Sequence, residues 1–277
     1  MSNVRIISWN VNGLRSPSMN LLTKNKELNN TSELYKLIQK TDPDIICINE
    51  TKCQEKNEGI FSNVLPFKYK IWNSSTLKLG YSGVAIFSKI PFNDLGKIPG
   101  LESNTENSTR HLQGGRTLFL EFDDFYLVHV YVPNTGNDKD EYRKNVWNPA
   151  IYNFLSSEKF KIKPLIYCGD LNVVSDLNDI YNPDIIKIGK SPGVKKYERE
   201  SFKKLLEELN YTDAMRFIKP EGNYWTWWDT RSKARDKDNG WRLDYFLVSN
   251  KEIISDCKIH NDVYGSDHCP ISLDISI

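Results

Sequence analysis

Five segments of the sequence carry side chains that bind metals or transfer protons, each where an apolar run of strand length ends. The residues are Asn10 and Asn12, Glu50, Tyr131 and Asn134, Asp170 and Asn172, and Asp267 and His268. Strands that repeatedly finish in such residues predict one shared rim, because loops at a sheet edge are where chemistry is usually done. We therefore expect the five segments to form a single site.

The segment from Leu165 to Asn172 shows the pattern most clearly. Its first four residues are apolar and predict a buried strand, which ends in Gly169, Asp170, Leu171 and Asn172. Asp and Asn are also ordinary turn residues, so this segment alone leaves a turn and an active site equally open. The other polar strand ends favour the active site.

The residue types of this rim indicate binding of a hard metal ion and a phosphate ester. They include carboxylates, amides, one tyrosine and one histidine, with no serine or cysteine nucleophile beside a base and no Walker-type glycine loop. Oxygen ligands without cysteine or clustered histidine favour Mg²⁺, or Mn²⁺, over Zn²⁺. A carboxylate and a histidine beside such an ion suit the hydrolysis of a phosphodiester.

Some of these residues also have a plainer interpretation. Glu50 could be an exposed strand-end charge, but the wholly apolar strand before it favours a ligand. His268 could be a satisfied core histidine, although its neighbour Asp267 and the turn at Gly265 favour a site. Asp244 lies inside an apolar strand, where an unpaired charge is costly, so we expect it to orient His268.

Composition limits the compartment and the kind of partner. The 277 residues carry a net charge of +1, so any nucleic acid must be met by a local basic surface. The five cysteines are odd in number and lack CxxC spacing, which predicts free thiols in a reducing compartment and disfavours disulfides or a zinc site. No signal peptide or transmembrane run is visible, so we expect an intracellular protein of the cytoplasm or nucleus, without a membrane partner.

The order of predicted elements indicates one α/β domain over residues 1–277. Strands are frequent, with helices between some and hairpins between others, such as 117–122 with 125–132. No linker or internal repeat interrupts this pattern. We expect two sheets packed face to face with helices outside.

Seven motifs resemble the exonuclease III family of abasic-site (AP) endonucleases, within the endonuclease/exonuclease/phosphatase superfamily. In chain order they are residues 9–15 (WNVNGLR), 50–52 (ETK), 80–83 (GYSG), 131–134 (YVPN), 169–172 (GDLN), 240–245 (GWRLDY) and 265–270 (GSDHCP). The resemblance spans essentially the whole chain. It implies a four-layer α/β sandwich with two mixed sheets, and a monomeric Mg²⁺-dependent enzyme. Such enzymes cut double-stranded DNA 5′ to abasic sites, leave a 3′-hydroxyl, and often trim blocked 3′ ends or act as 3′→5′ exonucleases.

The resemblance also implies roles for individual residues. Metal binding falls to Glu50, with Asn10, Asn12 and Asp267 as further candidates. The catalytic residues would be Asp170, which activates water and is held by Asn172, and His268, which is paired with Asp244 and acts at the phosphate. Tyr131, with Asn134 beside it, would act at the leaving oxygen. The abasic sugar would enter a pocket of Trp227, Trp241 and Leu243, and further DNA contacts would come from Tyr81, Arg15, Lys52, Arg231 and Asn182.

Three positions depart from better-known members, and two other functions stay open. Asn12 stands where animal enzymes carry Asp, Arg231 replaces a Met, and Asn137 replaces an Arg that animal enzymes insert into DNA. A relative with the same fold could act on undamaged DNA, RNA or a phospholipid or inositol phosphate, but the aromatic pocket argues against this. A non-catalytic DNA-binding module is disfavoured because each chemical position holds a competent residue.

Overall fold

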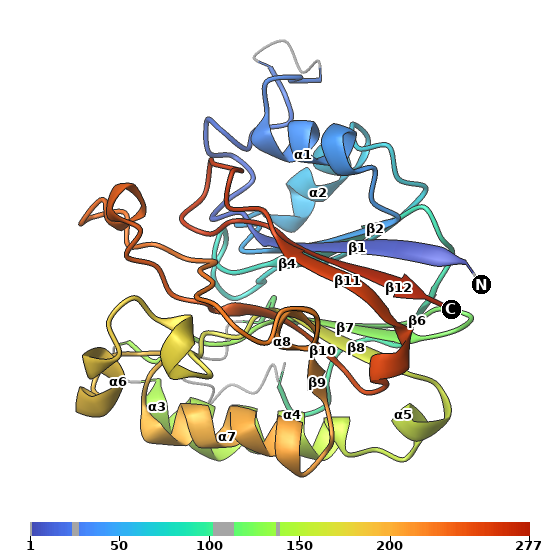
Figure 1. Ribbon diagram of the computed structural model, residues 1–277. Coiled ribbons are helices and arrows are strands. Elements are labelled where there is room, and N and C mark those ends of the chain that lie inside the picture. Colours follow the sequence, from blue (N-terminus) through green and yellow to red (C-terminus); the bar gives the residue numbers. More distant parts are fainter. Residues whose placement is uncertain (1, 24–27, 102–113, 137–138) are drawn as a thin grey trace.

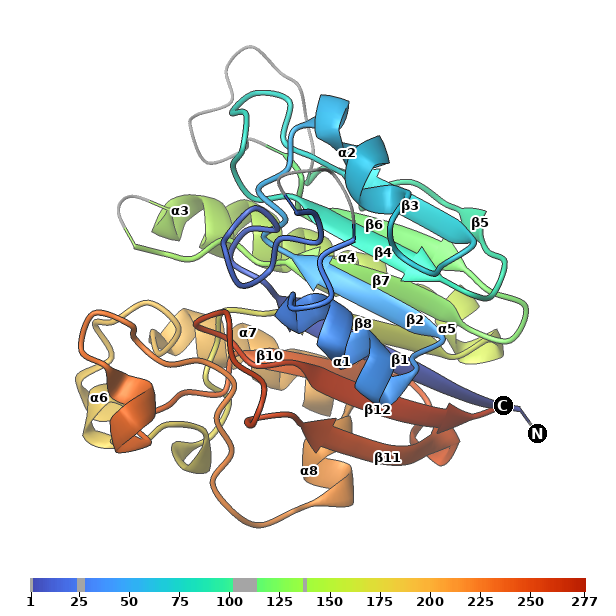
Figure 2. The same ribbon diagram turned by 90° about the horizontal axis from the view of Figure 1, so that it is seen from above.

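Two six-stranded sheets pack face to face, and helices cover the outer face of each, which gives four layers (Figures 1 and 2). The structure is a computed structural model that describes residues 2–23, 28–101, 114–136 and 139–277. Both sheets have the same plan, with a parallel pair of strands in the middle and antiparallel neighbours. The predicted four-layer α/β sandwich is confirmed.

The first sheet contains both ends of the chain. Its order is β11 (Ile254–Ile259), β12 (Ile271–Ser276), β1 (Asn3–Asn10), β2 (Ile45–Asn49), β4 (Val84–Ser88) and β3 (Tyr69–Asn73). β1 runs parallel to β2 and antiparallel to β12. The N- and C-termini therefore lie side by side at one end of the sheet (Figure 1), and β1 ends at Asn10, away from them.

The second sheet has the order β5 (Asn93–Asp94), β6 (Thr117–Glu121), β7 (Tyr126–Tyr131), β8 (Leu165–Asp170), β10 (Asp244–Val248) and β9 (Thr212–Asp213). β7 and β8 form its parallel pair, and β6 with β7 forms the hairpin that the alternating residues predict. Central strands such as β2 and β8 are buried throughout, which explains why they read as unbroken apolar runs.

The helices lie outside the two sheets. α1 (Glu33–Thr41) and α2 (Glu55–Ser62) cover the first sheet, and α4 (Asn148–Leu155) and α7 (Lys196–Glu207) cover the second (Figure 1). A π-helix links α3 to α4. The shorter helices are α3 (Asp140–Tyr142), the π-helix (Arg143–Trp147), α5 (Lys159–Ile162), α6 (Asp184–Ile188), α8 (Ala214–Ile218) and the 3₁₀ turns Leu177–Asp179, Ala234–Lys237 and Lys251–Ile253.

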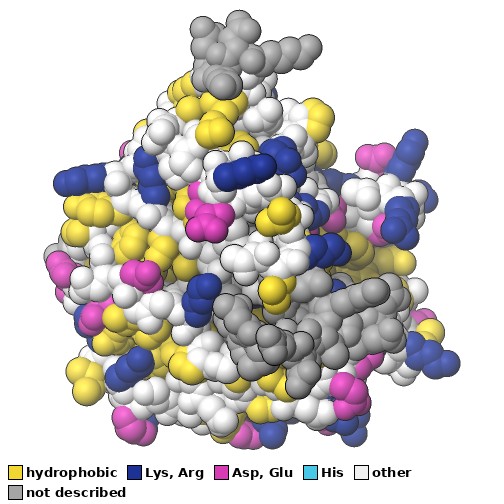
Figure 3. Space-filling view, turned by 180° about the vertical axis from the view of Figure 1, so that it is seen from behind, with side chains coloured by type: hydrophobic (Ala, Val, Ile, Leu, Met, Phe, Trp, Pro, Cys, Tyr) yellow, Lys and Arg dark blue, Asp and Glu magenta, His cyan; other side chains and the backbone are white. Residues whose placement is uncertain are grey.

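Three apolar layers hold the sandwich together. One lies between the sheets and includes Ile45 and Ile166, one joins the first sheet to its helices, and one joins the second sheet to α4 and α7. All five cysteines are buried and free, as the sequence predicts. Within the described ranges, no helix is long and apolar enough to cross a membrane. The face shown in Figure 3 mixes Lys and Arg with Asp and Glu, in keeping with the near-neutral net charge.

Candidate active site

The four central strands deliver most of the predicted rim, whereas Asp267 and His268, which we expected at a strand end, lie in the loop before β12 (Ile271–Ser276). β1 ends at Asn10, which is paired with Asn49 at the end of β2, while β7 ends at Tyr131, paired with Asp170 at the end of β8. The two sheets pack so that these ends meet at one cavity of about 340 Å³. Ten of the predicted site residues line it: Glu50, Tyr131, Asn134, Asp170, Asn172, Trp227, Trp241, Leu243, Asp267 and His268.

Gly169 allows β7 and β8 to approach closely enough to form this rim. Its φ is +135°, and a Cβ added there would lie 1.9 Å from the carbonyl oxygen of Val130. Only glycine fits such a contact, because every other residue would place a carbon inside the neighbouring backbone. The glycine before Asp170 is therefore a packing requirement.

Asn10 joins the carboxylates of the two sheets. The Asn10 side chain is fully buried, and its amide nitrogen donates to Glu50 Oε1 at 3.1 Å and to Asp170 Oδ2 at 3.0 Å. The amide oxygen of Asn10 accepts from the backbone nitrogen of Asn12. Asn10 thus fixes the spacing between the two carboxylates across the interface of the sheets.

Asp170 is the most perturbed carboxylate of the rim. Burial raises the pKa of Asp170 to about 7, Asp244 and Glu50 add to the rise, and His268 opposes it. Asn172 donates its backbone nitrogen to Asp170 Oδ1 at 3.0 Å and its side-chain nitrogen to Oδ2 at 3.3 Å. A carboxylate with a pKa near neutrality is suited to accept a proton from water.

His268 is held between two carboxylates. Its Nδ1 lies 2.8 Å from Asp244 Oδ2, which confirms the expected pairing, and its Nε2 lies 3.7 Å from Asp170 Oδ2. Burial alone would lower the pKa of His268, but Asp244 and Asp170 outweigh it and raise the pKa to about 10. The ring therefore carries a proton on each nitrogen at neutral pH and acts as a cationic donor.

Glu50 and Asp267 form the second, more open side of the rim. Lys52 Nζ lies 2.9 Å from Glu50 Oε2 and also donates to the side chain of Asn12. Asn12 in turn donates to Asp267 Oδ1 at 3.0 Å, and Trp227 Nε1 donates to Asp267 Oδ2 at 3.1 Å. Burial would raise the pKa of Glu50, but Lys52 and Asn10 outweigh it and lower the pKa, so the carboxylate is ionised.

Four of the nine described non-glycine residues with positive φ belong to this site or contact it directly. Asn12, Glu50, Lys52 and Asn172 all have φ between +47° and +50°, a region that side chains other than glycine rarely adopt. Such residues persist only where the surroundings hold them, and they cluster at functional sites. Four of them around one cavity support a functional origin for this geometry.

The donor set of the rim fits a hard divalent cation. Glu50, Asp170 and Asp267 line one cavity, and burial, with the charges of Asp244 and Glu50, raises the pKa of Asp170. Asp170, Asp244 and His268 also bring their donor atoms within 4.8 Å of one another. The raised pKa of His268 favours the protonated ring, which does not bind metals, so the side of the cavity with Glu50 and Asp267 is the better position for a metal ion.

Aromatic and apolar side chains form the opposite wall of the cavity. Trp227 and Trp241 meet edge to face with ring centroids 5.6 Å apart, and Leu243 lies beside them. Ser191, Pro192 and Gly193 close this wall, and a Cβ on Gly193 would lie 3.6 Å from the Trp241 ring. This wall is apolar, whereas the rim is charged, so the cavity suits a ligand with a compact apolar part next to an anion.

A buried ion network holds the aromatic wall in place. Arg242 lies between Trp241 and Leu243, is 1% exposed, and donates to Asp179 and Asp213 through both ends of its guanidinium group. Arg216 adds a second cation at 2.5 Å from Asp179. This network fixes residues 241–244, and with them the wall and the partner of His268.

Five of the predicted DNA contacts do not line the cavity: Tyr81, Arg15, Lys52, Arg231 and Asn182. Tyr81 lies outside it, where its hydroxyl meets Arg116 and Lys139 at 3.1 Å each. Arg15 is exposed, and its guanidinium lies against Gly80, the residue before Tyr81. Arg231 is exposed, and Asn182 accepts from the backbone nitrogen of Asp184 at the start of α6. Asn137 lies outside the described residues.

Several residues of the site carry no obvious signal in the sequence. Asn49 donates to the carbonyl of Val130 at 2.7 Å and accepts from the backbone nitrogen of Asp170, so it joins the two sheets. Thr226 holds the backbone nitrogens of Leu243 and Asp244. In the sequence, Asn49 is recognisable only as an amide at the end of an apolar strand, next to the more conspicuous Glu50.

Comparisons with known proteins agree with this geometry. The chain is 37% identical to a protein of Bacillus subtilis named exodeoxyribonuclease, covering 99% of this chain and 100% of the relative. It is 38% identical to the DNA repair nuclease APEX1 of Danio rerio, covering all of this chain and 83% of that protein. The crystal structure of an AP endonuclease from Leishmania major superposes with a TM-score of 0.79 at 26% identity, over 99% of this chain and 88% of that one.

A family match covers the site from its first strand to its histidine. Residues 7–268 match the endonuclease/exonuclease/phosphatase family, and this range holds every residue of the rim and of the aromatic wall. The chain therefore belongs to the endonuclease/exonuclease/phosphatase family, with relatives among the exodeoxyribonucleases and AP endonucleases.

Proposed function

We propose that this protein is a DNA repair hydrolase that cuts the backbone of double-stranded DNA 5′ to an abasic site and leaves a 3′-hydroxyl. The observation that carries the proposal is the joining of a charged rim to an apolar wall in one cavity of about 340 Å³. The rim supplies groups for phosphodiester hydrolysis, and the wall offers an apolar surface to a sugar without a base. The cavity is formed within one chain, which supports action as a monomer.

Asp170 and His268 carry the proton and charge transfer in this proposal. Asp170 accepts the proton of the attacking water, and Asn172 holds its carboxylate in position. The protonated His268 donates from Nε2 to the phosphate, where negative charge grows in the transition state. Burial and the charge of Glu50 raise the pKa of Tyr131, so this phenol keeps its proton and can donate to the leaving oxygen, with Asn134 beside it.

Glu50 and Asp267 are the residues proposed to hold Mg²⁺, with Mn²⁺ as the alternative, and Asn10 and Asn12 complete the set. Bound there, the ion supplies positive charge that neutralises a substrate phosphate. Lys52 contacts Glu50 directly, so it supplies a second positive charge at the same carboxylate. Asn12 is neutral and makes the site less negative than one with a carboxylate at this position would be.

The wall of Trp227, Trp241 and Leu243 is proposed to select the lesion. An abasic nucleotide has no base to unstack or unpair, so it costs less to turn out of the helix than a normal nucleotide. Tyr81, Arg15, Lys52, Arg231 and Asn182 are proposed to contact the DNA around the lesion. A cluster of Lys78, Arg116 and Lys139 around Tyr81 gives that part of the surface the local positive charge that a phosphate backbone needs.

The same rim suits the removal of blocking groups from 3′ ends, because such ends present a sugar phosphate without a following nucleotide. The relative named exodeoxyribonuclease supports this second activity. Both reactions break the bond between phosphorus and a 3′ oxygen and leave a 3′-hydroxyl, so both would use Asp170 and His268.

An incision assay on matched duplexes tests the proposal. One duplex carries a single abasic analogue, the other is identical but undamaged, and both are incubated with Mg²⁺. We expect a cut 5′ to the analogue and little cleavage of the undamaged duplex. Leu243→Ala would enlarge the cavity at the apolar wall and should reduce the difference in cleavage rate between the abasic and the undamaged duplex. Efficient cleavage of undamaged DNA or RNA, with no preference for the analogue, would instead support a different substrate.

A further inference from the structure

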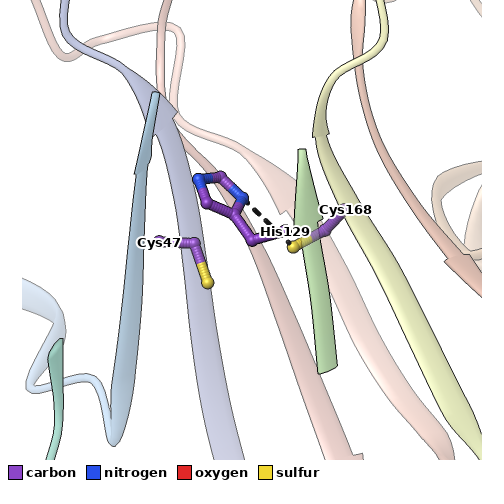
Figure 4. A group of neighbouring side chains, drawn as sticks. All are labelled: Cys47, His129 and Cys168. Atoms are coloured by element: carbon purple, nitrogen blue, oxygen red, sulfur yellow. Dashed lines mark hydrogen bonds between the residues drawn. The ribbon is translucent and has the colours of Figure 1, made fainter. Parts of the chain in front are cut away.

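A second group of metal-binding side chains lies in the core, away from the active-site cavity. Cys47 of β2 faces Cys168 of β8 across the interface of the two sheets, and His129 of β7 lies beside them (Figure 4). One donor atom of each residue lies within 4.8 Å of the other two. All three side chains are 0% exposed. Neither the proposed reaction nor the apolar core requires them.

The register of the strands explains how these residues meet. Cys47 is paired with Ser8 in the first sheet, and Cys168 is paired with His129 in the second. Four polar side chains thus occupy neighbouring positions in the two sheets, in a layer where their neighbours are Ile, Val, Leu and Phe. A patch of this kind inside an apolar layer costs stability unless its groups find partners.

The partners that the described residues provide are insufficient. His129 Nδ1 meets Cys168 Sγ at 3.7 Å, which is a weak contact, while His129 Nε2 and Ser8 Oγ are buried with no hydrogen-bond partner. An imidazole that uses one nitrogen weakly and the other not at all is costly to bury. The buried Ser8 hydroxyl without a partner is a second observation, independent of the cysteines, that points to a missing ligand.

We propose that Cys47, Cys168 and His129 bind a zinc ion, with the hydroxyl of Ser8 available as a fourth ligand. Two cysteines and a histidine are a common zinc set, and two thiolates neutralise the charge of Zn²⁺ in a dry core. A sulfur and a nitrogen that share a tetrahedral zinc lie about 3.6 Å apart, from the usual bond lengths. The observed 3.7 Å between His129 and Cys168 matches this separation.

The geometry also indicates that the bound metal would not exchange readily with metal ions in solution. Because the three residues are fully buried, the metal would enter during folding and would resist chelators in the native protein. The site would tie β2 to β8 two residues behind Asn49 and Asp170.

Metal analysis of the purified full-length chain tests the proposal. The protein is produced in medium containing zinc, dialysed against EDTA to strip the oxygen-ligand rim, and measured by mass spectrometry for elements. We expect about one zinc per chain, lost in Cys47→Ala, Cys168→Ala and His129→Val. Cys257→Ala is the matched control, because Cys257 is another buried strand cysteine outside the cluster, and it should keep the metal.

Cobalt separates the core site from the active site. Protein produced with Co²⁺ should show a sulfur-to-metal charge-transfer band, which oxygen ligands such as Glu50 do not give, and the Cys47→Ala variant should lack it. His129→Val keeps both sulfurs and should lower the band and the metal content, even if a cysteine variant fails to fold. No retained zinc and no band in the unmodified chain would overturn the proposal, as would a Cys47–Cys168 disulfide found in its place. None of these readouts depends on incision, so they stand apart from the proposed repair activity.

Discussion

His268 Nδ1 lies 2.8 Å from Asp244 Oδ2, and this buried pair links the loop before β12 to the first residue of β10. Asp244 raises the pKa of His268 and so keeps the ring protonated where it faces the cavity. The pair therefore sets both the position and the charge of the group proposed to meet the phosphate.

Asp244→Asn should slow incision strongly without preventing folding. The amide cannot hold a positive charge on His268, so the ring loses its cationic hydrogen bond to the phosphate. We expect the single-turnover rate on abasic DNA to fall about 10²- to 10⁴-fold, the usual contribution of such a group. Circular dichroism should be unchanged, and a rate within a few-fold of the unmodified enzyme would remove His268 from the proposed role.

Gly169→Ala should prevent β7 and β8 from pairing as they do. The added Cβ would lie 1.9 Å from the carbonyl oxygen of Val130, so the strands must separate beside Asp170. We expect a loss of several kcal/mol in the free energy of unfolding, measured by denaturant titration. Gly59→Ala in α2 is the control: nothing lies within 4 Å of its added Cβ, and the change should stabilise by about 0.5–1 kcal/mol. Equal effects of the two variants would show that the close approach is not required.

Asp179→Ala should destabilise the protein through the network that holds the aromatic wall. It would leave Arg242 buried with only Asp213 as an anionic partner, and breaking a buried ion pair typically costs about 3–5 kcal/mol. Asp184→Ala breaks an exposed pair with Lys187 and should cost less than about 1 kcal/mol. Thermal melts of the two variants compare them directly. A small effect at Asp179 would mean that Arg242 does not depend on it.

The Asp179 carboxylate should also contribute to the pH dependence of the free energy of unfolding in acid. Burial opposes its ionisation, but Arg242 and Arg216 outweigh burial and lower the pKa of Asp179 in the folded state. Its contribution is therefore present above the pKa of the unfolded chain, about 3.9, and is lost as the pH falls through the lower folded value. The stability difference between the unmodified chain and Asp179→Asn should be largest above about pH 4 and should shrink below it. A difference that stays constant down to pH 2 would contradict this account.

The sequence predicted the parts of the site that follow from strand ends. Asp170 could be predicted because an apolar run stops abruptly at it, and the resemblance placed His268, which lies in the loop before β12, in the same rim. The role of Arg242 could not be predicted from the sequence. A basic residue between Trp241 and Leu243 does not reveal that it is 1% exposed and paired with Asp179, 63 positions earlier. The proposed zinc site was disfavoured for the same reason: Cys47, His129 and Cys168 meet only when the two sheets pack. Pairing across sheets depends on register and packing, which local patterns do not contain.

The central claim is that this rim cuts DNA at abasic sites by using Asp170 to activate water. The most direct test is a single-turnover incision assay with Mg²⁺ on a duplex carrying one abasic analogue, run with the unmodified chain and with Asp170→Asn, while binding of the same duplex is measured separately. We predict a 5′ cut that leaves an extendable 3′-hydroxyl, a loss of about 10²-fold or more in the Asp170→Asn rate, and similar DNA binding by both proteins. No cut at the analogue, or an unchanged rate in Asp170→Asn, would contradict the account.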